Sequence, residues 1–256
     1  MKAVILAGGL GTRISEETNR KPKPMIEIGG KPILWHIMKH LSNHGINEFV
    51  ICLGYLGYSI KEYFINLNRH NNDFKINIKT GEVKNFSEKT EDWTVHLIDT
   101  GQETMTGGRL KRVQSLLGDD NFLLTYGDGI SDINITELIN FHKKNKKLAT
   151  VTAVKPLGRF GSLSINETNE VENFSEKPKG DIGWINGGFF IINKKCIDLI
   201  EDDDTFWERE PLNSLVMEKQ LNAYKHEGFW FAVDTMRDKI YLEKLITSGG
   251  KFPWLE

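Results

Sequence analysis

Residues 3–13 read AVILAGGLGTR, an apolar run that ends in a glycine-rich turn. A run this short is typical of a strand that is buried on both faces of a parallel sheet. The carboxyl edge of such a sheet is where α/β proteins bind their ligands, and a turn of glycines lets backbone N–H groups approach phosphate oxygens closely. The stretch therefore predicts an α/β fold with a phosphate-binding turn after its first strand. A tight turn between a strand and a helix, without a ligand, is the alternative.

From that turn onward, strand-like and helical patterns alternate along the chain. Apolar residues recur at helical spacing in 33–41, a second short apolar run follows at 49–53, and 60–67 is helical again. This alternation is typical of βαβ units and predicts a mainly parallel sheet between helices. No repeat, linker or proline-rich hinge divides residues 1–256, so one domain is expected. Further strands are expected at 94–99, 122–126, 149–155, 161–165, 188–193 and 229–233, and further helices at 109–117, 135–143, 208–220 and 236–246.

Two stretches depart from this pattern. Residues 75–95 interrupt the alternation and are interpreted as an inserted hairpin or a loop. His36, His40 and His44 follow one another at four-residue spacing on the first helix, a spacing that can hold zinc. No Cys or acidic residue completes a ligand set beside them, so a polar helix face or a contact between subunits is the preferred interpretation.

The overall composition argues against several kinds of partner. With 33 Lys and Arg against 35 Asp and Glu, the formal charge of −2 gives no field that would gather nucleic acid or anionic lipid. The two cysteines, Cys52 and Cys196, cannot form a disulfide framework, which fits a reducing compartment. No stretch approaches the roughly 20 apolar residues of a membrane span, and the first apolar run is too short for a signal peptide. We therefore expect a cytoplasmic protein without a nucleic-acid or membrane partner.

The glycine turn also allows a second interpretation, as the start of a dinucleotide-binding fingerprint in a dehydrogenase. Gly9 and Gly11 fit the first two positions of that fingerprint, but Ile14 stands where its third glycine belongs. Residues 15–24 are polar and interrupted by prolines, whereas the fingerprint continues directly into a helix. Both departures argue against a dehydrogenase.

Two cations follow the turn. Arg13 comes directly after it, and Lys23 stands between two prolines that keep the segment extended. Cations held in advance suit a polyphosphate. A solvated basic loop is the alternative, and it describes Lys21 better than Lys23.

Two carboxylates stand at the ends of predicted strands. Residues 122–129 read FLLTYGDG, a buried strand that exposes Asp128 between glycines, and residues 229–234 read FWFAVD, which ends in Asp234. Magnesium in proteins uses one or two carboxylates together with water and substrate phosphates, so two isolated aspartates are sufficient for a site. A plain turn at Asp128 is the alternative, and the sequence does not show that the two carboxylates meet.

A third candidate region follows in the second half of the chain. Residues 175–179 read SEKPK and offer a loop cation, Lys177, before a proline. Residues 185–190 read INGGFF and begin a strand with glycines, which admit a ligand close to the backbone. Together they would suit a sugar phosphate.

Taken together, these pieces resemble the sugar-phosphate nucleotidyltransferases, the family that activates sugar 1-phosphates with a nucleoside triphosphate. Their order and spacing match the family from end to end. Within the family the likeness is greatest to members that join CTP and glucose 1-phosphate. That likeness runs through residues 6–13, 21–25, 99–101, 105–112, 125–129, 158–161, 185–190 and 234–235.

The resemblance implies a single-domain, Rossmann-like nucleotidyltransferase fold with a mixed, mainly parallel sheet flanked by helices, and usually a homo-oligomer. It also implies a role for each site residue. The nucleotide would be held by Leu6, Ala7, Gly8, Gly9, Gly11, Thr12, Arg13, Lys23, Thr104 and Arg109, and a magnesium ion by Asp128 and Asp234. The catalytic residues would be Arg13, Lys23, Asp128 and Asp234. The sugar phosphate would be bound by Lys177, with Glu176 and the backbone about Gly161 and Gly187 at the sugar hydroxyls.

The reaction implied by the resemblance is an in-line attack of the sugar phosphate on the α-phosphorus of CTP, which yields CDP-glucose and pyrophosphate for the synthesis of a surface polysaccharide such as the lipopolysaccharide O-antigen. One alternative is the same reaction with another nucleotide or phosphorylated acceptor, as in thymidylyl or uridylyl transfer, because a few loop contacts choose the base. Another is a catalytically silent protein that binds a nucleotide-sugar. The sequence departs from the family pattern at 130–132 and around 68–92, which bears on subunit packing and loops.

Overall fold

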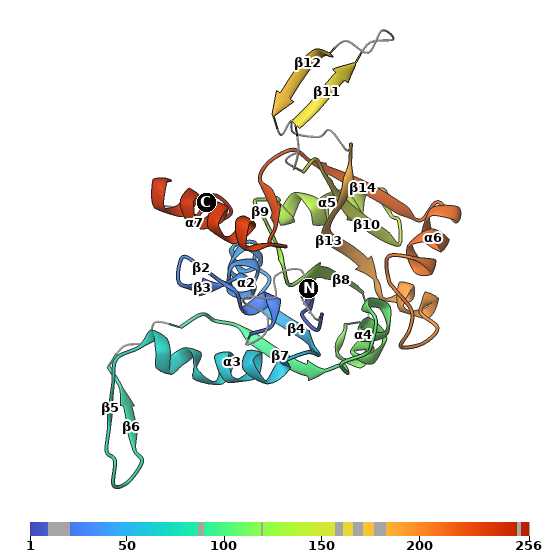
Figure 1. The fold of residues 1–256 in the computed structure, drawn as a ribbon. Coiled ribbons are helices and arrows are strands. Elements are labelled where there is room, and N and C mark those ends of the chain that lie inside the picture. Colours follow the sequence, from blue (N-terminus) through green and yellow to red (C-terminus); the bar gives the residue numbers. More distant parts are fainter. Residues whose placement is uncertain are drawn as a thin grey trace.

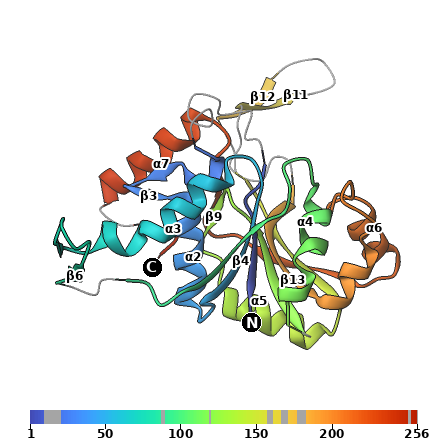
Figure 2. The ribbon, with the colours of Figure 1, turned by 90° about the horizontal axis from the view of Figure 1, so that it is seen from below.

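The structure is a computed structural model that describes residues 1–9, 21–86, 90–118, 120–156, 161–165, 171–176, 183–249 and 252–255. A single large sheet runs through the molecule, with helices on both of its faces (Figures 1 and 2). Among the described helices, none combines the length and the apolar character that a membrane span requires.

The large sheet has seven strands in the spatial order β14-β10-β13-β8-β1-β4-β7. Four of its six neighbouring pairs are parallel, and only β13 runs against its neighbours β8 and β10. The mixed, mainly parallel sheet is therefore as predicted. The strands are β1 (Ala3–Leu6), β4 (Glu48–Leu53), β7 (Thr94–Asp99), β8 (Asn121–Tyr126), β10 (Ala149–Val154), β13 (Ile185–Asn193) and β14 (Leu221–His226).

Helices cover both faces of the sheet and enclose two hydrophobic cores (Figure 2). Because side chains alternate along a strand, β1 sends Ala3 and Ile5 into one core and Val4 and Leu6 into the other. The strand is buried on both sides, as its unbroken apolar run predicts. The first core is covered by α2 (Ile33–Asn43), α3 (Gly57–Asn71), α5 (Ile135–Asn145) and α7 (Met236–Gly249), and the second by α4 (Thr106–Arg112) and α6 (Glu210–Met217).

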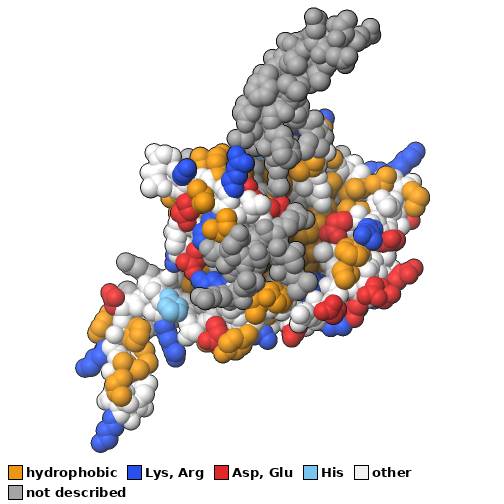
Figure 3. Space-filling view, viewed as in Figure 1, with side chains coloured by type: hydrophobic (Ala, Val, Ile, Leu, Met, Phe, Trp, Pro, Cys, Tyr) orange, Lys and Arg blue, Asp and Glu red, His pale blue; other side chains and the backbone are white. Residues whose placement is uncertain are grey.

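Four two-stranded sheets complete the part of the chain that the structure describes. The pair β5–β6 forms a hairpin that extends away from the body of the molecule (Figure 1), and apolar side chains gather on it (Figure 3). The interpretation of this region as an inserted hairpin is therefore confirmed. The pairs are β2 (Glu27–Ile28) with β3 (Lys31–Pro32), β5 (Phe74–Ile76) with β6 (Val83–Asn85), β9 (Gly129–Ser131) with β15 (Trp230–Ala232), and β11 (Gly161–Ile165) with β12 (Val171–Glu176).

The histidines of α2 are not a polar helix face, because two of them lie inside the protein. His36 is 0% exposed, and its Nε2 lies 2.8 Å from the carbonyl oxygen of Ile28. His40 is 6% exposed, with Nδ1 3.1 Å from the carbonyl oxygen of Trp254 and Nε2 2.9 Å from that of Ile133. Carbonyl oxygens that face the imidazoles make their burial possible. The two side chains therefore attach α2 to β2, to the segment before α5 and to the C-terminal segment.

Candidate active site

The glycine turn after β1 has a tightly packed residue and an open one. The carbonyl oxygen of Gly8 accepts hydrogen bonds from the N–H of Tyr55 at 3.3 Å and from Nη2 of Arg109 at 3.2 Å. A Cβ atom added at Gly8 would lie 2.2 Å from Nη1 of Arg109, whereas one added at Gly9 would meet none of the described residues within 4 Å. Gly8 is thus a glycine because the guanidinium packs against it.

A cavity of about 430 Å³ opens at the carboxyl ends of β1 and β8. This is the edge at which the sequence predicts the ligand. Nine of the predicted site residues line the cavity, namely Leu6, Ala7, Gly8, Gly9, Lys23, Thr104, Arg109, Asp128 and Asp234. Six further described residues line it, namely Pro24, Met105, Thr106, Tyr126, Gly127 and Phe206.

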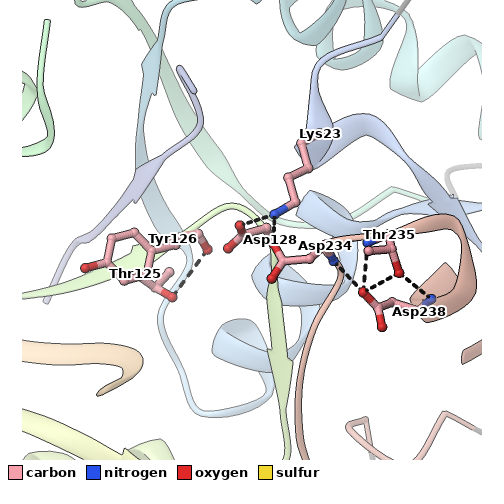
Figure 4. Close-up of polar contacts among 7 residues, drawn as sticks. All are labelled: Lys23, Thr125, Tyr126, Asp128, Asp234, Thr235 and Asp238. Atoms are coloured by element: carbon pink, nitrogen blue, oxygen red, sulfur yellow. Dashed lines mark hydrogen bonds and ion pairs between the residues drawn. The ribbon is translucent and has the colours of Figure 1, made fainter. Parts of the chain in front are cut away.

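Lys23 joins the two predicted carboxylates in this cavity (Figure 4). Its Nζ lies 2.6 Å from Oδ2 of Asp128 and 2.7 Å from Oδ1 of Asp234. The three side chains come from the short 3-10 helix η2 (Lys23–Met25), from the turn between β8 and β9, and from the end of β15. We call Lys23, Asp128 and Asp234 the lysine bridge.

Backbone hydrogen bonds fix the two aspartates relative to each other without any help from Lys23. The N–H of Val233 donates to the carbonyl oxygen of Asp128 at 3.0 Å, which continues the pairing of β9 with β15. The carboxylate of Asp238 in the first turn of α7 accepts from the N–H groups of Asp234 at 2.9 Å and Thr235 at 2.8 Å. The hydroxyl of Thr235 donates to the same oxygen (Figure 4), so this helix start holds Asp234 in place.

The lysine bridge keeps its ammonium group charged. Burial lowers the pKa of Lys23, but the charge of Asp128 and hydrogen bonds to both carboxylates outweigh it, and the pKa stands above its ordinary value of 10.5. The ammonium of Lys23 therefore remains a cation between the two aspartates.

The geometry of the lysine bridge also shows whether Asp128 and Asp234 fit a divalent cation. Asp128 and Asp234 already share one positive centre at less than 3 Å from each, so their positions suit a common cation. Among the described residues, no group of three or more His, Cys, Asp or Glu side chains gathers as a metal cage. Two carboxylates with open space beside them match the way magnesium is bound, with its remaining ligands from water and phosphate.

Arg109 faces the cavity, but its guanidinium is used inside the protein. It is 5% exposed and donates to the hydroxyl of Thr100 at 2.8 Å. Burial lowers the pKa of its guanidinium below the ordinary value. Its other acceptors are the carbonyl oxygens of Gly8, Leu53, Gly101 and Gln102, at 2.8 to 3.2 Å. Arg109 therefore ties α4 to the glycine turn and to the loops after β4 and β7.

Glu208 supports the opposite wall of the cavity from behind. Its Oε1 accepts from the hydroxyl of Tyr126 at 2.5 Å, and its Oε2 accepts from the hydroxyl of Thr106 at 2.6 Å. The same Thr106 oxygen accepts from the N–H of Trp207 at 3.0 Å. One carboxylate thus connects the end of β8 with the start of α4, and both connected side chains line the cavity.

The remaining predicted residues are placed less fully. Gly187 lies on β13 outside the cavity wall, where its carbonyl oxygen accepts from Nε1 of Trp230 at 2.7 Å. Gly161 and Glu176 are direct partners in the pairing of β11 with β12. The residues outside the described part of the chain are Gly11, Thr12, Arg13 and Lys177.

Sequence reasoning missed six of the described residues that line the cavity, and also Glu208 behind its wall. Tyr126 and Gly127 directly precede Asp128, and Pro24 follows Lys23, so neighbourhood in the chain was an available signal. Phe206 on the wall and Glu208 behind it had no such signal, because only the folded chain brings them there. Glu208 lies 82 residues from its partner Tyr126 in the chain.

Comparisons with known proteins match the sequence and the architecture. The sequence model of the family described as "Nucleotidyl transferase" matches residues 2–238. A glucose-1-phosphate cytidylyltransferase of Salmonella typhi is 56% identical over 99% of this chain and 98% of that relative. A mannose-1-phosphate guanyltransferase of Saccharomyces cerevisiae is 34% identical over 93% of this chain and 62% of that relative. The crystal structure of HddC from Yersinia pseudotuberculosis complexed with GMP-PN has a TM-score of 0.70 at 23% identity, covering 96% of this chain and 99% of that one.

Proposed function

The chain belongs to the nucleotidyl transferase family, and on that premise we propose that it transfers the cytidylyl group of CTP to α-D-glucose 1-phosphate, giving CDP-glucose and pyrophosphate. The observation that carries the choice of substrates is the high identity to a glucose-1-phosphate cytidylyltransferase along almost the whole chain. The cavity supports the type of reaction, since it combines a glycine turn, a lysine and two carboxylates at one sheet edge.

The proposed reaction needs no nucleophile from the protein, because the attacking oxygen of the sugar phosphate is already an anion. That oxygen forms a bond to the α-phosphorus of CTP. The bond from the α-phosphorus to the oxygen that bridges to the β-phosphate breaks in line, and pyrophosphate leaves with the electron pair. The contribution of the protein is to position two anions and to neutralise their charge.

Positive charge near the phosphates is what the proposed site has to provide. Two unit charges 4 Å apart repel by about 1 kcal/mol in water and by about 4 kcal/mol at an effective dielectric constant of 20. Lys23 lies on the cavity wall and is placed to reduce this repulsion, while the backbone at Gly8 and Gly9 borders the same space. By resemblance, we propose that Arg13 and Lys177 add two further cations, at the triphosphate and at the sugar phosphate.

Asp128 and Asp234 would hold a magnesium ion, which when bound neutralises charge on the phosphates and on the departing pyrophosphate. The shared position of their carboxylates on Lys23 supports this assignment. Glu176 and the backbone at Gly161 and Gly187 are proposed, by resemblance alone, to contact the hydroxyls of the sugar.

We further propose that the protein works in the cytoplasm as a homo-oligomer that supplies a surface-polysaccharide pathway. Exposed apolar side chains on the β5–β6 hairpin support self-association, with Ile78 in its turn 85% exposed. Light scattering after size exclusion should give a multiple of the chain mass of 29.3 kDa. A mass of one chain would contradict the oligomer and leave the reaction untouched.

The test of the proposed function is pyrophosphate release by the purified protein with magnesium, with and without glucose 1-phosphate, in separate reactions with CTP, UTP, dTTP, ATP and GTP. Release that requires both CTP and glucose 1-phosphate is expected. Release with UTP or dTTP would keep the mechanism and change the nucleotide. Release only with GTP and mannose 1-phosphate would favour the activity named for the yeast relative. No release with any pair would contradict the reaction and favour a silent nucleotide-sugar binder.

A further inference from the structure

The lysine bridge consists of two fixed carboxylates and one movable cation. The backbones of Asp128 and Asp234 are held by the hydrogen bond between Val233 and Asp128 and by the cap at the start of α7. Lys23 reaches them with a side chain of four methylene groups, which rotates freely once its contacts are lost. Its backbone is anchored nearby, since the buried Pro24 packs where a Cβ of Gly127 would stand. A change in the site therefore moves Lys23 first.

The ammonium occupies the place that a metal ion would need. It contacts an oxygen of each carboxylate at 2.6 and 2.7 Å, and its side chain is only 13% exposed. A magnesium ion coordinated by the same oxygens would stand within a few ångströms of the ammonium, and two cations so close repel each other strongly. Because Lys23 is tethered to the chain, it competes with a free ion at a high effective concentration. Free magnesium is thus at a disadvantage against the ammonium at these two carboxylates.

A nucleoside triphosphate removes this conflict. Its phosphates offer the ammonium a new anionic partner, and they also supply ligands that the two carboxylates alone do not give to magnesium. We propose that Lys23 occupies the metal position until the nucleotide binds, so that the divalent ion enters together with the triphosphate rather than before it. This inference rests on the metal site of the proposed function and adds an order of binding to it.

The test measures binding of Mn²⁺ alone, as a magnesium substitute whose free ion is counted by electron paramagnetic resonance, without nucleotide or sugar phosphate. The wild-type protein should bind Mn²⁺ weakly, and Lys23→Met should bind it at least tenfold more tightly. Lys23→Arg keeps a cation and should remain weak. Lys21→Met is the matched control, because Lys21 pairs with Glu27 at 2.6 Å on the surface and its removal should leave the affinity unchanged. Equal affinity of the wild-type protein and Lys23→Met would overturn the proposal.

Addition of an α,β-methylene analogue of CTP gives a second measurement. The analogue should raise the Mn²⁺ affinity of the wild-type protein by a larger factor than that of Lys23→Met, because only the wild-type protein has an ammonium to move. An equal factor in both proteins would overturn the proposal.

Thermal unfolding checks the fold of the variant and gives a third readout. Without metal, Lys23→Met leaves two carboxylates side by side and should unfold at a lower temperature than the wild-type protein. Mn²⁺ should raise its unfolding temperature by more than it raises that of the wild-type protein, and equal shifts would count against the proposal. None of these assays measures catalytic turnover. If CTP and glucose 1-phosphate released no pyrophosphate while Lys23→Met bound Mn²⁺ tenfold more tightly, the substrates would be wrong and the role of Lys23 would stand.

Discussion

Gly8 and Gly9 are neighbours in the chain, yet only Gly8 touches a buried cation. Gly8→Ala places a Cβ atom 2.2 Å from Nη1 of Arg109, and that guanidinium cannot swing aside because four carbonyl oxygens and a hydroxyl hold it. We expect the substitution to lower the free energy of unfolding by about 1–3 kcal/mol, the usual effect of overpacking. Urea unfolding measures it. Gly9→Ala would meet none of the described residues and should change the free energy by less than about 0.5 kcal/mol. Equal losses in the two variants would contradict this explanation.

The two aspartates of the lysine bridge should matter for turnover and little for folding. Asp128→Asn and Asp234→Asn keep the shape of the side chain and remove the charge that would hold magnesium. We expect each to lower kcat by about 100-fold or more, the scale seen when one charge-stabilising contact at a reacting centre is removed. Circular dichroism should remain that of the wild-type protein. Asp203→Asn, which removes an exposed pair with Arg112, is the control and should keep its turnover. Wild-type turnover and magnesium dependence in both bridge variants would refute the metal assignment.

Site residues could be predicted from the sequence where they stand next to a recognisable element. Lys23, Asp128 and Asp234 each lie at a proline-bounded segment or a strand end, and the structure brings the three together. Arg109 was predicted near the nucleotide, and its internal role was not foreseen, because the five acceptors of its guanidinium are assembled only by the fold. The nucleotide and sugar contacts of the predicted residues stay predictions.

At the scale of elements, N–H groups at the start of α4 bind the segment before α6 and do not remain available to a ligand. The N–H groups of Met105 and Gly107 donate to the carbonyl oxygens of Asp203 and Thr205, at 2.8 and 2.9 Å. A Cβ at Gly107 would lie 2.6 Å from the oxygen of Thr205, so this contact requires a glycine. The start of α4 is therefore satisfied within the protein, and its position depends on the residues around 203–208.

Glu208 should act on nucleotide binding through the side chains that it positions. Glu208→Ala frees the hydroxyls of Tyr126 and Thr106 on the cavity wall, and we expect KM for the nucleotide to rise about tenfold, since hydrogen bonds to a charged group are worth about 1.5–3 kcal/mol. The value of kcat should change less. Glu208→Gln can accept from one hydroxyl and donate to the other, so it should restore most of the KM. Steady-state kinetics decide, because a purely structural role would reduce the amount of active protein and leave KM alone.

Most elements in the first half of the chain were predictable, because local pattern and tertiary burial agree there. The strand expected at 94–99 is β7, and the helix expected at 33–41 is α2 with two more residues. β14 (Leu221–His226) was missed, since its sequence, LNAYKH, is polar and it lies at the edge of the sheet. The helix expected at 208–220 is shorter, Glu210–Met217, because its ends are fixed by Pro211 and by β14.

At the scale of the whole molecule, His40 connects α2 to residues far away in the chain and His36 connects it to Ile28, and both connections should depend on pH. Burial lowers the pKa of both to about 4 from the ordinary 6.5. In the unfolded chain these histidines are therefore protonated below about pH 6.5, whereas in the folded protein they stay neutral until about pH 4. The free energy of unfolding is therefore unaffected by these groups above pH 6.5. As the pH falls from 6.5 to 4, each histidine lowers it by about 1.4 kcal/mol per pH unit.

Urea unfolding between pH 7.5 and pH 4.5 tests this prediction. The variant His40→Gln stays neutral throughout, so its stability should fall less steeply than that of the wild-type protein. His44→Gln is the comparison, because that ring is half-exposed beside Thr136. Parallel curves for His40→Gln and the wild-type protein would refute the role of His40.

The architecture as a whole was predictable to the level of a mixed, mainly parallel sheet between helices, and the comparisons with nucleotidyl transferases agree with it. The place of β13 was not predictable from local pattern. Its apolar run fits any buried strand, and only the long-range pairing with β8 and β10 reverses it. The expectation of one domain over residues 1–256 stays a prediction.

The position of β13 has a consequence for the folding of the chain while the ribosome synthesises it. Among the described strands, β10 pairs with β13 and β14, both of which are synthesised after it, and β8 pairs with β13 on one side. Until residue 193 has left the exit tunnel, both edges of β10 and one edge of β8 lack their partners, while β1, β4, β7 and the other edge of β8 can already pair. Unpaired strand edges promote aggregation of incompletely folded chains. The reversed strand thus sets the moment in translation at which β8 and β10 are joined in one sheet, and the outer edge of β10 is covered later, when β14 is made.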